Sequence, residues 1–529
     1  MEAGLGCGGR RNDLQSQINI SNGSETQYTY HADGLMSTMT NGGATYNYTF
    51  GDNGLLVSRG NAAHTLTINS RDGRGRILTD TVTSNSSTPL SEVMTWRDDS
   101  KLDSYTANRS GQDSNSVNVW NETRQYWYNA RGQLLTEPYK PTASTAETLT
   151  YQFDQNSENG PGVRTQAQVS PTKNYNVPAT NGENTYLQVK NETAMPGDAS
   201  SDAVQWWYDG DGNASSWNSA TRGSKGLNFD TQNRLVGVTQ RDNSNNGYNW
   251  SAIYDGLGRR IQTVTQPVIG GSPTGAPVTV QAMFDPQVEF LELGLQINGA
   301  MSWRAVGPDL SGVYGGKQGV GGIEAFATSG GVLPVISNAF GDVVASVGGG
   351  GVSWNPAQVG SYGLLPGSNG VTLSVNTDWA KATVWRSRYL DVTGFYNLGA
   401  RYYDPQSGRF LSADPLGHAS SLTLYDYANG DPVNGVDADG RYGASAFSSG
   451  YTAPTSKAFD AGPMANLLSS PAAFNQAQAQ AWDEGEAADE AAGKITPGFF
   501  IHNPEVMVVG MMAAVSLPLT IEGLPALGS

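Results

Sequence analysis

Cysteine and histidine are both scarce in this 529-residue chain, and their scarcity excludes two kinds of stabilising centre. Cys7 is the single cysteine, so no disulfide can form within the chain and stability must come from packing. The four histidines are widely spaced, and with one thiol they form no Cys/His metal-binding pattern. We therefore expect no metal site and no cofactor.

Charged residues are also few, at 15% of the chain, and acidic residues outnumber basic ones by 48 to 31. The net charge of −17 means that most of the surface repels nucleic acid and anionic membranes, so no nucleic-acid partner is expected. The apolar stretch 506–519 is too short for a membrane span, and no transmembrane segment is predicted. No apolar segment of the kind found in signal peptides follows Arg10 and Arg11.

Glycine, by contrast, is abundant, with 66 residues, and it is accompanied by 24 tyrosines, 12 tryptophans and many Asn, Ser and Thr residues. This composition favours β-strands, tight turns and half-exposed aromatic faces, and it provides poor material for helices. The fold class that we predict is all-β.

An irregularly spaced repeat organises the first two thirds of the chain. Each copy has alternating aromatics or Tyr-Asp, then a polar turn with glycine, then an apolar pair. The copies begin at Tyr28, Tyr46, Ile68, Tyr126, Trp206, Leu227 and Ile253, with a weaker copy at Ser337. Each copy predicts a hairpin, since alternating residues share a sheet face and Asp-Gly supplies the turn. One hairpin cannot bury its own apolar face, so successive copies are expected to pair into a continuous sheet.

These copies resemble YD repeats, named for the Tyr-Asp that stands here at Tyr208-Asp209 and Tyr254-Asp255. The resemblance covers residues 25–345, after an irregular N-terminal piece, 1–24. It implies a long antiparallel sheet that spirals into a hollow or partly open shell.

Two glycine-rich stretches interrupt this pattern. Residues 315–322, GGKQGVGG, invite comparison with a phosphate-binding loop, but they lack the G-x-x-x-x-G-K-[ST] spacing and no helix-forming stretch follows. Phosphate binding is therefore not predicted there. Residues 346–387 are expected to be a connecting segment of loops and irregular strands.

The segment 388–441 contains the most distinctive sequence motifs in the chain. It contains TGFYNLGARYYDP, GRFLS, DPLG, LYDY and DPVN in that order. It resembles the RHS repeat-associated core, which in that family plugs the end of the shell. Its Asp-Pro pairs predict turns at strand ends, and Asp404, Asp431 and Asp437 are expected to be turn formers.

In toxin-bearing members of this family, the core cuts its own chain after a second DPxGL-like motif with the help of aspartates. Here the resemblance makes Asp414 and Asp426 the candidate catalytic pair. Two close carboxyls cannot both ionise cheaply, so one can activate water while the other stays protonated. Arg409 or Arg401 is the candidate group that orients a carboxylate or polarises the carbonyl.

The expected cut lies at Gly440, Arg441 and Tyr442, most simply after Arg441. The second motif departs from the family pattern, because Ala438 replaces proline and Arg441 replaces leucine. His418 likewise replaces a leucine after the first motif. These departures leave open whether any autoproteolytic, aspartic-type activity exists.

Residues 442–529 form a variable tail. We predict a Ser/Ala/Gly-rich linker over 442–470, a helix over 471–493 and a short apolar element over 506–519. In the family this position holds an effector, often a toxin. Few basic side chains and one histidine, His502, give no evident nuclease cluster.

Two functions follow from the resemblance. In the first, a shell encapsulates and presents its own C-terminal segment as cargo and releases it by self-cleavage. In the second, a non-enzymatic structural or adhesion protein binds carbohydrate or neighbouring cells. Both imply a secreted or cell-surface location, and a secretion-system or surface partner is an open alternative.

Overall fold

The computed structural model describes residues 16–18 and most of residues 25–447. The described ranges are 16–18, 25–85, 87–110, 122–139, 147–153, 164–169, 174–176, 191–192, 204–219, 223–328, 330–355, 359–364, 382–417 and 424–447. The chain divides into two compact units, residues 1–453 and 454–529. The predicted helix over 471–493 and the apolar element over 506–519 lie outside the described residues.

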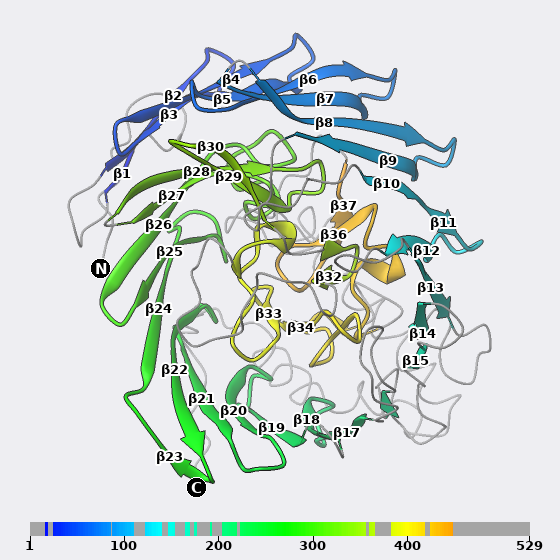
Figure 1. Cartoon of the computed structure of the whole chain (residues 1–529), viewed down its shortest axis with the longest axis vertical. Coiled ribbons are helices and arrows are strands. Elements are labelled where there is room, and N and C mark those ends of the chain that lie inside the picture. Colours follow the sequence, from blue (N-terminus) through cyan, green and yellow to red (C-terminus); the bar gives the residue numbers. More distant parts are fainter. Residues whose placement is uncertain are drawn as a thin grey trace, which may run out of the picture. The chain divides into compact units, whose positions relative to one another are not determined.

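The repeat hairpins form three large antiparallel sheets, which we call the wall (Figure 1). The strands of the first are β1 (Ser16–Ile18), β2 (Glu25–Tyr30), β3 (Met36–Asn41), β4 (Ala44–Phe50), β5 (Leu56–Gly60), β6 (Thr65–Arg71), β7 (Ile77–Ser84), β8 (Ser87–Trp96), β9 (Leu102–Arg109) and β10 (Glu122–Gln125). The strands of the second are β11 (Trp127–Tyr128), β12 (Leu134–Tyr139), β13 (Glu147–Phe153), β14 (Arg164–Val169) and β15 (Asn174–Asn176).

The third sheet continues the same order along the chain. Its strands are β16 (Asn191–Glu192), β17 (Val204–Tyr208), β18 (Ala214–Ser219), β19 (Gly223–Phe229), β20 (Leu235–Arg241), β21 (Gly247–Tyr254), β22 (Arg260–Ile269), β24 (Val278–Phe284), β25 (Glu292–Ile297), β26 (Ala300–Val306), β27 (Ile323–Thr328), β28 (Gly331–Ser337), β29 (Val343–Gly348) and β30 (Gly351–Trp354), with β23 (Ser272–Pro273) paired to β22. Apart from the short β23, each strand of this sheet pairs with the next one in sequence, as expected when every hairpin pairs with its successor. The prediction of an all-β antiparallel repeat fold is confirmed.

Three small sheets belong to the segment that follows the wall. They are formed by β31 (Val359–Gly360) with β32 (Gly363–Leu364), by β33 (Tyr396–Asn397), β34 (Tyr402–Asp404) and β35 (Arg409–Phe410), and by β36 (Gly435–Asp437) with β37 (Gly443–Ser445). Two 3-10 turns span Trp385–Ser387 and Ala428–Gly430. We call residues 382–447 the core segment; Figure 1 shows it in yellow and orange, with wall strands around it.

In several hairpin turns of the wall, an aspartate or asparagine side chain closes the turn. Asp255 is typical: its Oδ1 accepts hydrogen bonds from the amides of Leu257 at 3.0 Å and Arg259 at 2.9 Å. Its Oδ2 accepts from Nε of Arg259 at 2.7 Å. Gly258 has a φ of 78°, which glycine adopts without a Cβ clash. The same double acceptance of amides occurs at Asp72, Asp209, Asp230, Asp242, Asn129 and Asn338.

Basic residues of these turns also bind the next repeat. The Arg234 guanidinium lies 4.8 Å from the ring centroid of Tyr254, and the Tyr254 hydroxyl donates to the carbonyl of Leu235 at 2.7 Å. Arg76 covers the Trp96 ring in the same way at 5.0 Å. Turns that carry such a basic residue therefore support the aromatic residue of the next repeat through a cation–π contact.

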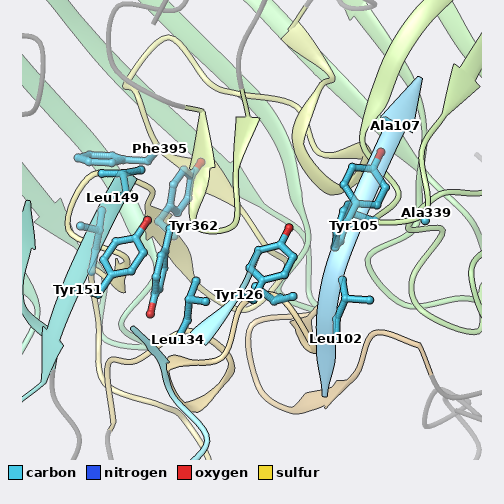
Figure 2. Close-up of a cluster of buried hydrophobic side chains, with 14 of the residues drawn as sticks. Leu102, Tyr105, Ala107, Tyr126, Leu134, Leu149, Tyr151, Ala339, Tyr362 and Phe395 are labelled. Carbon is cyan, nitrogen blue, oxygen red and sulfur yellow. The ribbon is translucent and has the colours of Figure 1, made fainter. Parts of the chain in front are cut away.

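The inner face of the wall carries the largest apolar cluster, part of which appears in Figure 2. Wall residues such as Tyr105 and Tyr151 contact aromatic residues from much later in the chain. Tyr105 packs edge-on against Phe340 at 4.8 Å between centroids, and Tyr151 packs against Tyr362 at 5.1 Å. The aromatic face that a single hairpin cannot cover is thus covered by later parts of the chain.

Buried polar contacts fix the wall to these later segments. Nη1 of Arg260 on β22 donates to Asp391 at 2.6 Å, in an ion pair that is almost fully buried. The Glu137 carboxylate on β12 accepts from both the amide and the hydroxyl of Ser361, at 3.0 and 2.7 Å. The first contact sets the position of the core segment against the wall, and the second sets that of the β31–β32 hairpin.

Replacing Asp255 with alanine removes two amide acceptors and an ion pair, so the turn 255–259 should open more often. At neutral pH we expect its amides to exchange with deuterium about tenfold faster, which corresponds to about 1.4 kcal/mol. The effect should shrink in acid. Burial of the Asp255 carboxyl is outweighed by its bonds to the Arg259 amide and side chain, which lower its pKa. Its contribution is therefore present at neutral pH and is lost as pH falls through the folded-state pKa.

Asp52→Ala, at an exposed residue of the β4–β5 turn, is the control and should leave exchange in 255–259 unchanged. Equal exchange rates for wild type and Asp255→Ala at neutral pH would contradict the role given to the repeat aspartate.

Candidate functional site

The β33–β34 hairpin places Arg401 in the interior of the core segment. The hairpin turn is closed by the Leu398 amide, which donates to the Arg401 carbonyl at 3.0 Å, and the Ala400 amide donates to the carbonyl of Asp439 at 2.9 Å. The Arg401 side chain is 3% exposed, and its guanidinium lies 3.7 Å from the centroid of the Phe410 ring. A charge held this far from water requires several acceptors.

Arg401 obtains its acceptors from three parts of the core segment. Its Nη2 donates to Oδ2 of Asp414 at 2.8 Å and to Oδ2 of Asp437 at 3.3 Å. Its Nη1 donates to the carbonyl of Leu424 at 2.9 Å, and its Nε donates to the carbonyl of Gly440. One guanidinium therefore joins two aspartates to the segment in which the cut is expected.

Asp437 is the carboxyl whose acidity the site changes most clearly. Burial disfavours its ionised form, and although Arg401 favours that form, the nearby Asp439 and Asp414 oppose it. The net effect raises the pKa of Asp437 to about 7. Near neutral pH a large fraction of this carboxyl is therefore protonated and available as a proton donor.

The backbone of Gly440–Tyr442 is held by the same acids. The Arg441 amide donates to Oδ1 of Asp437 and to Oδ1 of Asp439, both at 3.0 Å. The Tyr442 amide donates to Oδ1 of Asp439 at 3.3 Å. Both polar atoms of the Gly440–Arg441 peptide group are therefore hydrogen-bonded: the carbonyl accepts from the Arg401 guanidinium, and the nitrogen donates to two carboxyl groups.

The Arg441 side chain has its own acidic partners. Its Nη2 lies 2.7 Å from Oε2 of Glu289 in the wall and 3.0 Å from Oδ2 of Asp439. Its guanidinium lies 5.2 Å from the centroid of the Phe290 ring. The arginine that replaces the family's leucine therefore has matching partners in this chain.

The structure places the predicted catalytic residues in two separate groups. Arg401, Asp414 and the segment 440–442 lie together. Asp426 pairs instead with Arg409: the two residues form an isolated β-bridge, and Nη1 of Arg409 lies 3.9 Å from Oδ1 of Asp426. Both side chains of this second pair are buried, at 3% and 5% exposure.

Sequence reasoning did not nominate Asp437, Asp439 or Glu289. Asp437 was expected only to form a turn, but its carboxyl reaches Arg401. The available signal was the second acid of Asp437-Ala438-Asp439, which a turn does not require. Glu289 lies 152 residues from Arg441 in sequence, so only the fold brings them together.

Across the described ranges, no group of three or more His, Cys, Asp or Glu side chains is arranged to hold a metal ion. Likewise, no helix within those ranges is long and apolar enough to cross a membrane.

Comparisons with known proteins give short sequence matches and several extensive structural matches. No family model matches the chain. Toxin subunit YenC2 of Yersinia entomophaga is 42% identical over 60 residues, which make up 11% of this chain and 6% of that protein. The tRNA3(Ser)-specific nuclease WapA of Bacillus spizizenii is 35% identical over 112 residues, which make up 20% of this chain and 4% of that protein. A solved Tc holotoxin pore of Photorhabdus luminescens matches 83% of this chain with a TM-score of 0.61 at 18% identity.

The chain is similar to RHS-type toxin-complex subunits. The structural match shows that the chain has the fold of the RHS/YD-repeat shell. The chain corresponds to 21% of the solved toxin chain and to a far smaller share of the curated relatives.

Replacing Arg401 with methionine should destabilise the core segment by about 3–5 kcal/mol, because it leaves two buried aspartates without their cation. The loss should grow as pH rises. Asp437 already has a raised pKa, so its ionisation costs the folded state more at pH 8 than at pH 6.

The measurement is thermal unfolding at both pH values, with Arg97→Met as the control, because Arg97 is 42% exposed. Equal melting temperatures for wild type and Arg401→Met at pH 8 would contradict the proposed burial of the two carboxyls.

Proposed function

We propose that this RHS-type chain is a shell that encapsulates and presents the polypeptide that follows Arg441, and that its core segment cuts the chain within Gly440–Tyr442. The observation that carries the proposal is the set of contacts made by Arg401. This one side chain binds Asp414, Asp437 and the carbonyl of Gly440. An acid, a second carboxyl and a polarised peptide carbonyl are the parts that peptide hydrolysis needs.

In the proposed reaction, water adds across one peptide bond. An ionised carboxylate, Asp414 in this proposal, takes a proton from the water, and the resulting hydroxide bonds to the Gly440 carbonyl carbon. Arg401 stabilises the negative charge that develops on the carbonyl oxygen. Protonated Asp437 lies 3.0 Å from the Arg441 nitrogen and donates the proton that this nitrogen needs as the bond breaks. Because the substrate is part of the same chain, its local concentration is high even for a slow site.

The neighbouring peptide bond is the second candidate for the cut. The nitrogen of Tyr442 lies 3.3 Å from Oδ1 of Asp439, which would supply the acid for cleavage after Arg441. The contacts favour the bond between Gly440 and Arg441, because both of its polar ends are held. The N-terminal fragments that the two alternative cuts would produce differ in mass by one arginine residue.

Asp426 and Arg409 make up an alternative catalytic set. The family resemblance nominates Asp426 as the partner of Asp414, whereas the contacts favour Asp437 in that role. Substitution of each aspartate separates the two hypotheses.

The relatives support a carrier role without establishing it for this chain. One solved neighbour with the same fold is TcdB2-TccC3 without its hypervariable C-terminal region, so in that protein the fold stands apart from the region that follows it. WapA is named as a tRNA nuclease, and YenC2 as a toxin subunit. We propose an equivalent division here, with a secreted or surface-exposed shell, partners within a toxin complex and the chain's own tail as cargo.

Intact mass under denaturing conditions tests the cut. Wild type should give two fragments with a break within 440–442, and Asp414→Asn and Asp437→Asn should each stay whole. Asp426→Asn should still cut if Asp437 is the acid. An uncut Asp426→Asn beside a cutting Asp437→Asn would move the role to the Asp414/Asp426 pair. A whole wild-type chain would remove self-cleavage and favour the structural or adhesion alternative.

The rate of the cut should depend on pH in a defined direction. Because the pKa of Asp437 is raised to about 7, its protonated form is depleted above that value. The rate of fragment formation should therefore fall about tenfold per pH unit well above pH 7. Time courses of refolded chain between pH 6 and pH 9 measure this, and a rate that increases throughout this range would contradict Asp437 as the acid.

A further inference from the structure

We propose that residues 443–447 are a built-in grip that keeps the downstream polypeptide bound to the shell after the chain is cut, which rests on the proposed self-cleavage. The partner that fits this surface is the leading end of the chain's own C-terminal product. Three independent sets of contacts hold these five residues.

The first set is strand pairing across the cut. β37 lies downstream of the proposed break and pairs antiparallel with β36, which lies upstream, in the register Gly435 with Ser445 and Asp437 with Gly443. The Ala446 amide extends this pairing by donating to the carbonyl of Asn434 at 2.6 Å. Breaking the connection between the strands removes one covalent link and leaves these hydrogen bonds in place.

The second set comes from Lys317 in the glycine-rich stretch of the wall. Its Nζ donates to the carbonyls of Ser445 and Ala446, both at 2.7 Å, and the residue is fully buried. Asp309 positions the lysine by accepting from its backbone amide. In a phosphate-binding loop, the lysine ammonium group would contact an anion. Here the ammonium group of Lys317 contacts the backbone of the downstream segment instead.

The third set is apolar. Phe447 packs edge-on against Trp96 of the wall at 4.9 Å between ring centroids and against Phe340 at 5.8 Å. Ala446 is 1% exposed and clusters with Val320. Small residues at 444–446 let the strand lie close to the wall, and the aromatic ring at 447 anchors its end.

These contacts use backbone carbonyls, backbone amides and one aromatic side chain. None of them requires the peptide bonds at 440–442 to be intact. Cutting and release are therefore separate events in this chain, and release needs the further step of pulling β37 away from β36 and Lys317.

The test uses the full chain with an N-terminal affinity tag. It is captured under native conditions, washed, eluted in denaturant and weighed by mass spectrometry. We expect wild type to yield cut chain with its C-terminal fragment retained at close to one-to-one stoichiometry. Lys317→Met and Phe447→Ala should each lower the retained fragment at least about fivefold without reducing the cut fraction.

Lys225→Met is the matched control, because Lys225 is also buried and also donates to a backbone carbonyl, that of Thr393 at 2.6 Å. This variant should retain the fragment as wild type does. Full retention in both Lys317→Met and Phe447→Ala would overturn the grip, as would loss of the fragment from wild type.

A second readout keeps the grip testable if the chain is never cut. In that outcome the denaturing mass overturns self-cleavage, and amide exchange of intact chain examines residues 443–447 alone. The grip predicts slow exchange of these amides in wild type and exchange at least about tenfold faster in Lys317→Met, with Lys225→Met unchanged. Rapid exchange in wild type would overturn it.

Discussion

The aromatic inner face of the wall is the constraint on which the rest of the structure depends. A sheet of repeat hairpins buries aromatics on one side, and that side must be covered for the fold to be stable. Later parts of the chain supply the cover, through rings such as Phe340 and Tyr362. Polar groups such as Arg260 and Glu137 fix its position, because a buried charge tolerates few arrangements.

The candidate site follows from the same constraint. The core segment consists of short strands and turns, so many of its carbonyls and carboxyls are buried without regular ladders to satisfy them. Arg401 satisfies several at once, and in doing so it draws Asp414 and Asp437 to the carbonyl of Gly440. Crowding of acids in a dry interior then raises the pKa of Asp437. In the proposed reaction, the side chain that stabilises the core segment, Arg401, is therefore also the one that prepares the peptide bond for hydrolysis.

Much of the fold could be predicted from the sequence, because its signals are local. The Asp-x-x-Gly turn at Asp255 and the alternating aromatics define hairpins without long-range information. The candidate site could be predicted only in part. Arg401 and Asp414 lie in a sequence that matches a family motif, but Asp437, Glu289 and Lys317 act through partners that only folding brings near. For Asp437 the sequence predicted only a turn-forming role, because a turn can be recognised from neighbouring residues alone.

An experimental structure of the Asp437→Asn chain tests the central claim most directly, because that variant should trap the uncut state. The account predicts an unbroken chain through residues 440–442, with the Gly440 carbonyl on Arg401 and β37 paired to β36. A chain in which Gly440 lies away from Arg401, with Asp414 bound to another cation, would contradict it.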